Sequence, residues 1–228
     1  MTLSVFNIFL ILHIAGGSIG LIAGTINMVR KKGDSKHKLT GKFFLYGMFT
    51  AAICALVMSV MHTSYFLFIT GIFTIYMVST GQRYLLLRRE QKPGLIDWAL
   101  TVFMLFFAII FIALGIFKLT KGESFGIVFI AFGYIGMRMV WGDVKNHTGK
   151  TELKNTWLVL HLQRMIGTYI AATTAFLVVN LPQDILPGYL NFIPWLTPTV
   201  ILVPLIFKWT RKYEVKKKPA EIVSSTNP

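Results

Sequence analysis

Long apolar stretches recur along this chain of 228 residues, and they constrain its fold more than any other feature. Each stretch is about 18–25 residues long, which is the length that a helix needs to cross the hydrocarbon core of a bilayer. Hydrophobic residues make up 54% of the chain and charged residues only 14%, where a soluble domain has roughly 25% charged residues. The sequence therefore predicts a multi-pass membrane protein with a single domain.

The predicted spans are α-helices, because lipid offers no partner for unpaired backbone groups and the stretches lack the period-two alternation of a β-barrel. We expect an all-α integral membrane bundle over residues 1–212. Residues 213–228 are expected to form a disordered basic tail in the cytoplasm. The seven predicted transmembrane helices are Val5–Val29, Gly41–Met61, Tyr65–Leu87, Leu95–Phe117, Phe125–Gly142, Thr156–Leu181 and Ile193–Trp209.

Lysine and arginine are segregated to one side of the predicted spans. Six of them follow the first span, whereas the opposite side has only Lys118 and Lys121. The positive-inside rule then places the N-terminus outside and the C-terminus in the cytoplasm, with the bacterial inner membrane as the expected location. Because the net charge of +14 lies in short loops beside the bilayer, the expected partner is anionic lipid headgroups and not nucleic acid.

Two basic residues, His161 and Arg164, lie inside the sixth predicted span. A cation in hydrocarbon costs at least ~2.5–3.5 kcal/mol on insertion scales, so such residues are expected to face a partner, a cavity or a ligand. The spacing of three puts both on one face of the helix. Arg138 lies in the cytoplasmic half of the fifth span. His13 lies in the first span, on the face formed by Gly16, Gly20 and Gly24.

Whether these cations are free to bind a ligand depends on the carboxylates that can pair with them. Asp97 and Asp143 stand at the predicted cytoplasmic ends of the fourth and fifth spans, and they are the expected counter-ions of Arg138 and Arg164. If both arginines pair internally, the charges hold the bundle together. If one stays unpaired, it suits a phosphate, a carboxylate, a lipid headgroup or a haem propionate. The sequence leaves both outcomes open.

Metal and haem sites are less favoured. Cys54 is the only cysteine, and the chain has neither a His-Glu-x-x-His nor a His-x-x-x-His motif, so no metal site is expected. A b-type haem needs two helix-borne histidines at similar depth, and His13 and His161 are the candidates, although their expected depths differ. A membrane redox protein with haem b or quinone is therefore one alternative. A structural or assembly protein with internally paired charges is another.

Several motifs resemble a family of bacterial multi-pass membrane proteins with a domain of unknown function. The first is His13-Ile-Ala-Gly16 with Gly20-Leu21 and Gly24, followed by a basic loop and His37-Lys-Leu-Thr-Gly41. The others, which resemble Bacteroidetes-type members, are the blocks Trp157-Leu-Val-Leu-His161-Leu-Gln-Arg164-Met165-Ile-Gly167 and Thr174-Ala-Phe-Leu-Val-Val-Asn180. The resemblance covers most of the chain. It implies a multi-helix inner-membrane fold and no particular activity.

The resemblance also draws attention to His37, which we expect in the loop before the second span. That loop lies on the cytoplasmic side, where the site is predicted. The leading hypothesis is a cationic pocket in the cytoplasmic half that binds or transports a small anionic ligand or ion. In it Arg164 and Arg138 hold the anion, His161 forms a hydrogen bond or exchanges a proton, and His13 lines the deeper cavity. The sequence indicates no catalytic residue and no oligomeric state.

Overall fold

The structure, a computed structural model, describes residues 4–87, 92–181, 186–190 and 192–215. Within these ranges the long elements are all α-helices, and seven of them are long and apolar enough to cross a membrane, which confirms the predicted multi-pass bundle. The helices are α1 (Val5–Val29), α2 (Ser35–Met61), α3 (Tyr65–Leu86), α4 (Leu95–Thr120), α5 (Gly126–His147), α6 (Thr156–Asn180) and α7 (Ile193–Arg211), with a 3-10 turn, η2 (Gly188–Leu190), before α7.

Several helices extend beyond the ranges predicted from hydropathy. Helix α2 begins at Ser35, six residues before its predicted start, because the Asp34 side chain accepts a hydrogen bond of 2.6 Å from the backbone N–H of His37 and caps the helix. Hydropathy detects only the part of a helix that lies in hydrocarbon, whereas the helix continues through the polar interface to its cap. His37 therefore lies in the first turn of α2, and the prediction that it lies in a loop is wrong.

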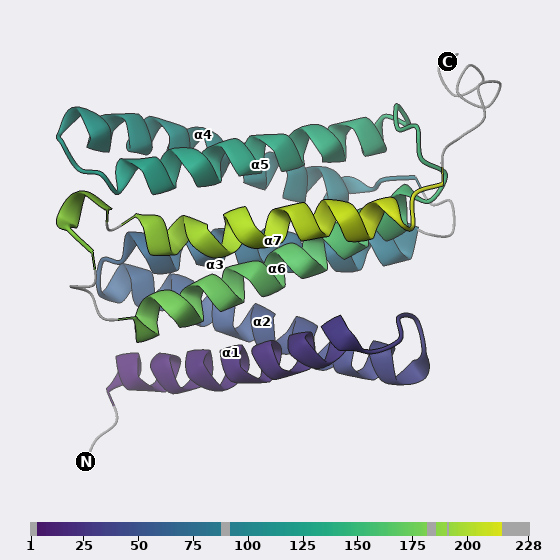
Figure 1. Cartoon of the computed structure of the whole chain (residues 1–228), viewed down its shortest axis with the longest axis horizontal. Helices are drawn as coiled ribbons and strands as arrows, with labels where there is room; N and C mark the ends of the chain where they lie inside the picture. The colour runs from purple at the N-terminus through teal and green to yellow at the C-terminus, as the bar shows by residue number, and fades with distance from the viewer. Residues whose placement is uncertain (1–3, 88–91, 182–185, 191, 216–228) are drawn as a thin grey trace.

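The helices are arranged in three groups along one axis (Figure 1). Helices α1 and α2 form an antiparallel hairpin along one side of the bundle, and α4 and α5 form a second hairpin along the opposite side. Between them lie α3 and α6, which pack against each other, with α7 against α6. Helix α3 is the most buried span and contacts both hairpins, so residues on α3 and α6 form the interior of the bundle.

Glycine makes both hairpins tight. A Cβ atom on Gly16 would lie 2.8 Å from the backbone oxygen of Gly47, so α1 and α2 are in direct backbone contact there. In the second hairpin, a Cβ atom on Gly126 would lie 2.5 Å from the backbone oxygen of Gly115. Small residues drive this kind of association in membranes, because lipid removes the hydrophobic effect and leaves close packing to hold helices together.

An aromatic core joins α3 to the α4–α5 hairpin. Phe73, Phe111 and Phe129 are all at most 2% exposed, and their rings contact one another and Phe132 in stacked and edge-to-face arrangements. Tyr76 lies one helical turn beyond Phe73 on α3 and is fully buried. The interior thus changes from aromatic hydrocarbon to polar groups within one turn of α3.

The cations gather at one end of the bundle. The last turn of α1, the first turns of α2 and α6 and the last turn of α7 all lie at the same end, at the right in Figure 1. Lys118 and Lys121 lie at the opposite end, close to the turn between α4 and α5. At the basic end the backbone N–H of Lys154 donates to the oxygen of Val215, so the first residues after α7 are held against the start of α6. Residues 216–228 of the predicted tail lie outside the described residues.

Candidate functional site

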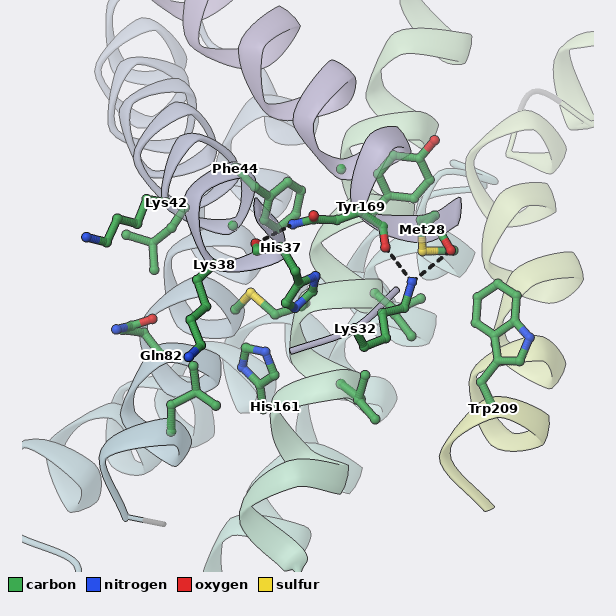
Figure 2. A pocket seen from close by; sticks show the side chains of 18 of the residues that line it. Met28, Lys32, His37, Lys38, Lys42, Phe44, Gln82, His161, Tyr169 and Trp209 are labelled. Atoms are coloured by element: carbon green, nitrogen blue, oxygen red, sulfur yellow. Dashed lines mark hydrogen bonds between the residues drawn. The ribbon is translucent and has the colours of Figure 1, made fainter. Parts of the chain in front are cut away.

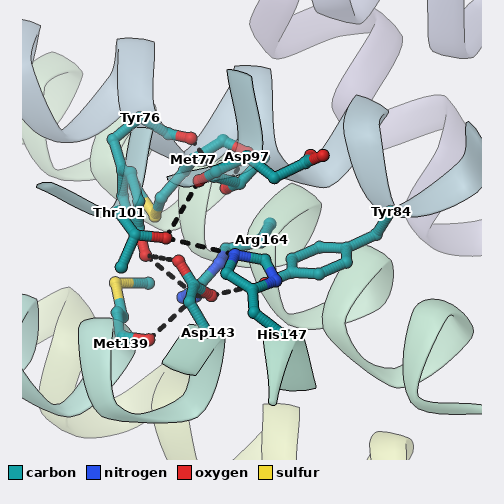
Figure 3. Close-up of polar contacts among 10 residues, drawn as sticks. Tyr76, Met77, Tyr84, Asp97, Thr101, Met139, Asp143, His147 and Arg164 are labelled. Carbon is teal, nitrogen blue, oxygen red and sulfur yellow. Dashed lines mark hydrogen bonds and ion pairs between the residues drawn. The ribbon is translucent and has the colours of Figure 1, made fainter. Parts of the chain in front are cut away.

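Arg164 and Asp143 form a buried ion pair in the centre of the basic half (Figure 3). Arg164 Nη2 donates to Asp143 Oδ1 at 2.5 Å, and the two residues are 2% and 0% exposed. Tyr84 donates to the same carboxylate oxygen at 2.5 Å, and Tyr76 donates to the other one. The carboxylate of Asp143 therefore has a donor from α6 and two donors from α3, and its charge is balanced inside the bundle.

The guanidinium of Arg164 is bonded through its Nη2 group, whereas its Nε is buried without a hydrogen-bond partner among the described residues. Its Nη2 group also contacts the Tyr76 hydroxyl at 3.0 Å and the backbone oxygen of Met139 at 3.3 Å. The ring of Tyr76 lies 5.0 Å from the guanidinium carbon, within cation–π range. Arg164 does not line the pocket described below. Of the two outcomes left open by the sequence, internal pairing is thus the one realised for Arg164, which ties α3, α5 and α6 together.

Asp97 has a different partner from the one predicted. Its carboxylate accepts hydrogen bonds of 2.9 and 2.8 Å from Nε and Nη2 of Arg83, in a bidentate ion pair between α4 and α3. It also accepts a bond of 2.8 Å from the backbone N–H of Gly94 and so caps the start of α4. The prediction that Asp97 balances Arg138 or Arg164 is wrong, because the fourth helix begins beside the end of the third and not beside Arg138.

Arg138 is not part of the interior. Its side chain is exposed on α5, and the guanidinium carbon lies 4.7 Å from the centre of the Trp141 ring. Lys145 lies over the same ring, 4.6 Å from its centre. These contacts are typical of a long cationic side chain that reaches toward the headgroup region from a lipid-facing position. The structure therefore does not bring Arg138 and Arg164 together.

His13 lies on the seam between α1 and α2. Its Nδ1 atom is 2.8 Å from the backbone oxygen of Ala51, one turn from the close contact at Gly16. His13 is 16 residues before the end of α1, whereas His161 is five residues after the start of α6. At ~1.5 Å per residue, their depths differ by roughly 15 Å. His13 and His161, the two histidines that the haem hypothesis requires, are therefore not brought together.

A pocket of about 600 Å³ lies at the basic end, between the α1–α2 hairpin and helices α3, α6 and α7 (Figure 2). It brings together His37 from α2 and His161 from α6, the two predicted site residues that line it. His161 Nδ1 is 2.9 Å from the backbone oxygen of Gly81. Because a carbonyl oxygen only accepts, Nδ1 carries the proton in this bond, and Nε2 is the nitrogen left for the pocket. His37 Nδ1 is buried without a hydrogen-bond partner.

Four lysines complete the lining of this pocket, and sequence reasoning missed them as site residues. They come from the loop after α1, from α2 and from the end of α7, and they are Lys32, Lys38, Lys42 and Lys212. No aspartate or glutamate lines the pocket within the described part of the chain. In the sequence these lysines predict membrane topology, and no pattern distinguishes lysines that face a pocket from those that face headgroups.

The four lysines are not equivalent. The Lys32 ammonium donates to the backbone oxygens of Asn27, Met28 and Arg30, which caps the end of α1. Partial burial lowers the pKa of Lys32. In contrast, neither Lys38 nor Lys42 has an ion-pair or hydrogen-bond partner among the described residues. Figure 2 shows these two on the α2 side of the pocket, on the same side as Gln82.

The basic half of the bundle therefore holds two separate polar sites. One is the closed ion pair of Arg164 and Asp143, and the other is the open pocket with His37, His161 and the lysines. They are adjacent on α6, because His161 and Arg164 are less than one turn apart. In comparisons with known proteins, the chain matches no family model, no curated protein and no solved structure.

Proposed function

We propose that this membrane protein binds a ligand with an anionic group in the pocket lined by His37, His161, Lys38 and Lys42. One observation carries the proposal: the cations that line the pocket have no carboxylate among the lining residues that the structure describes. In the two buried or part-buried ion pairs of the same half, by contrast, Arg83 is paired with Asp97 and Arg164 with Asp143. The pocket is therefore a place where cations from several helices gather without a carboxylate.

The donors in the pocket suit a phosphate or a carboxylate. The ammonium groups of Lys38 and Lys42 each carry three protons without a partner among the described residues. The unpartnered His37 Nδ1 and the free Nε2 of His161 add two ring nitrogens that donate when protonated. Charge-assisted hydrogen bonds of this kind are about twice as strong as neutral ones. His37 and Lys38 come from α2 and His161 comes from α6, so a ligand bound by all three contacts two of the three helix groups.

The proposal includes the side of the membrane. The positive-inside rule assigns the lysine-rich end to the cytoplasm, and the pocket opens at that end. The ligand is then taken up from the cytoplasm or from the cytoplasmic leaflet of a bacterial inner membrane. The pocket lies at this end of the bundle, and the proposal is therefore one of binding.

Binding of inorganic phosphate to the purified protein in dodecyl maltoside micelles tests the proposal, with isothermal titration calorimetry as the measurement. We expect Lys38→Gln and His161→Gln each to weaken binding by about tenfold, because a hydrogen bond to a charged group is worth roughly 1.5–3 kcal/mol. Lys36→Gln is the matched control. Lys36 lies in the same first turns of α2 and is exposed, but it does not line the pocket.

The control variant is expected to bind phosphate as the unmodified protein does. Size-exclusion profiles and thermal unfolding of all three variants check that the fold is retained. Phosphate binding that is absent, or that is equally strong in Lys38→Gln, His161→Gln and Lys36→Gln, would overturn the proposal.

A further inference from the structure

We infer that the ligand of this pocket is an anionic phospholipid from the surrounding membrane, with its phosphate at Lys38, His37 and His161. This inference rests on the proposed function and names its ligand class. Three features of the pocket carry it: its size, its apolar wall and the places where it reaches the outside of the bundle.

The pocket is far larger than a single phosphate requires. Its volume of about 600 Å³ falls within the roughly 300–1,000 Å³ that is typical of pockets for drug-sized molecules. Lys38, Lys42 and Gln82 lie on the α2 side, with His37 and His161 in the centre (Figure 2). A bare phosphate held there leaves the rest of the pocket unfilled.

The remaining wall is apolar and comes from three helices. It is formed by Met28 of α1, Leu162 and Ile166 of α6, and Trp209 of α7. Met28 and Ile166 also belong to a cluster of apolar side chains with Ile206 on α7, so this wall continues along α7 into the bilayer. Buried apolar area stabilises a bound chain by about 25 cal/mol per Å². Of these four side chains only the indole N–H of Trp209 can donate a hydrogen bond, so the wall fits an acyl chain better than a second polar group.

The pocket reaches the outside of the bundle on the sides that face lipid. Trp209 is 37% exposed on α7, and Tyr46 is 66% exposed on α2. Trp209 lies two residues before the end of α7, where the outside of the bundle meets the headgroup layer, and Tyr46 lies about three turns into α2, on its apolar part. A phospholipid can therefore place its phosphate among the cations and keep its chains in the bilayer. A water-soluble anion has no chain to fill the apolar part of the pocket.

Native mass spectrometry of the protein in dodecyl maltoside micelles tests the lipid class. The probes are dioleoyl phosphatidic acid, dioleoyl phosphatidylcholine and inorganic phosphate. We expect one copy of phosphatidic acid to bind, about tenfold more tightly than phosphatidylcholine and more tightly than inorganic phosphate. Lys38→Gln should remove the preference for phosphatidic acid over phosphatidylcholine, and Lys36→Gln should retain it.

A second pair of variants tests the chain-binding wall. Trp209→Ala should weaken the binding of phosphatidic acid several-fold and leave inorganic phosphate unchanged. Phe207→Ala is its control, because Phe207 is also exposed on α7 but does not line the pocket.

The outcomes separate this inference from the proposed function. If inorganic phosphate binds in a Lys38-dependent manner and phosphatidic acid binds no more tightly, the lipid class is wrong and the proposed function stands. If neither probe responds to Lys38→Gln, both are wrong. If phosphatidic acid binds tightly and Lys38→Gln removes its preference over phosphatidylcholine, both are supported.

Discussion

Arg164 and His161 show how position within one turn of helix decides what a basic residue does. Both lie in the basic half of α6, yet Arg164 faces the carboxylate of Asp143 and is 2% exposed, whereas His161 faces the pocket. A guanidinium keeps its charge at any accessible pH, so in a membrane interior it requires a counter-ion. An imidazole can be neutral, so it tolerates a place where its second nitrogen has no fixed partner.

The ion pair of Arg164 and Asp143 should contribute to the stability of the fold. Asp143→Ala should reduce the free energy of unfolding by about 3–5 kcal/mol, because it leaves the Arg164 charge buried without a counter-ion. Unfolding in mixed micelles with increasing sodium dodecyl sulfate measures the loss. The control is Arg138→Ala, which removes an exposed cation from the same helix and should change stability by about 0.5 kcal/mol or less.

The double variant Asp143→Leu with Arg164→Met refines this prediction. Its loss of stability should be smaller than the sum of the two single losses, because the second change removes the charge that the first leaves unpaired. Additive losses would show that the two side chains do not interact and would contradict the buried ion pair.

At the scale of helices, the bundle is two tight hairpins held on a central layer. Glycines at the backbone contacts of α1 with α2 and of α4 with α5 bring each pair together without large side chains between them. The α1–α2 hairpin meets α6 over a smaller surface, and the pocket lies at that junction. The hairpins are thus compact, and the space for a ligand is left between groups of helices.

Gly16→Ala tests the backbone contact in the first hairpin. The new methyl group would lie 2.8 Å from the Gly47 oxygen and 3.2 Å from the Ala51 nitrogen, and backbone atoms cannot rotate away. We expect a loss of about 1–3 kcal/mol, measured by unfolding in the same mixed micelles. Gly17→Ala is the control, since its nearest neighbour is an Ala51 side chain 4.0 Å away, and it should be neutral or stabilising. Equal effects of the two changes would show that the hairpin is not in backbone contact.

For the whole molecule, the alternation of the seven helices places the first residue of α1 and the last residue of α7 at opposite ends of the bundle (Figure 1). It also gathers the cations of the loops at the end where the pocket opens. Several of the lysines from which the positive-inside rule predicts the orientation therefore also line the proposed site.

Cysteine labelling tests this orientation. The background is Cys54→Ala, which removes the only cysteine of the chain from a buried position on α2. In that background, Lys121→Cys should react with a membrane-impermeant maleimide in intact bacterial cells, because Lys121 lies at the end predicted to be outside. Lys150→Cys lies at the other end and should react only after the cells are lysed. Both lysines are exposed. The reverse pattern of labelling would show that the N-terminus is in the cytoplasm.

Much of this architecture is contained in the sequence, because hydropathy and charge are local properties. Each span is detected by its own residues, so the number of helices and the ends at which the lysines gather follow from the sequence. The sequence also predicts the buried pairing of Arg164 as one of two possibilities, the other being a bound anion, since a charge in hydrocarbon requires a partner. Hydropathy does not locate the ends of the helices, because a cap such as Asp34 starts α2 before its apolar part begins.

The tertiary structure alone decided which groups meet. The sequence ranks Asp97 and Asp143 equally as partners of the arginines. Only the packing of the helices brings Asp143 to Arg164, whereas Asp97 pairs with Arg83. Arg138 and His13 are also basic side chains within predicted spans, like His161. Arg138 faces outward, however, and His13 lies on the seam between α1 and α2. Lys38 and Lys42 line the same pocket as His161 because α2 and α6 both border it in the folded bundle. Such contacts depend on the rotation and depth of each helix relative to the others, which no local pattern specifies.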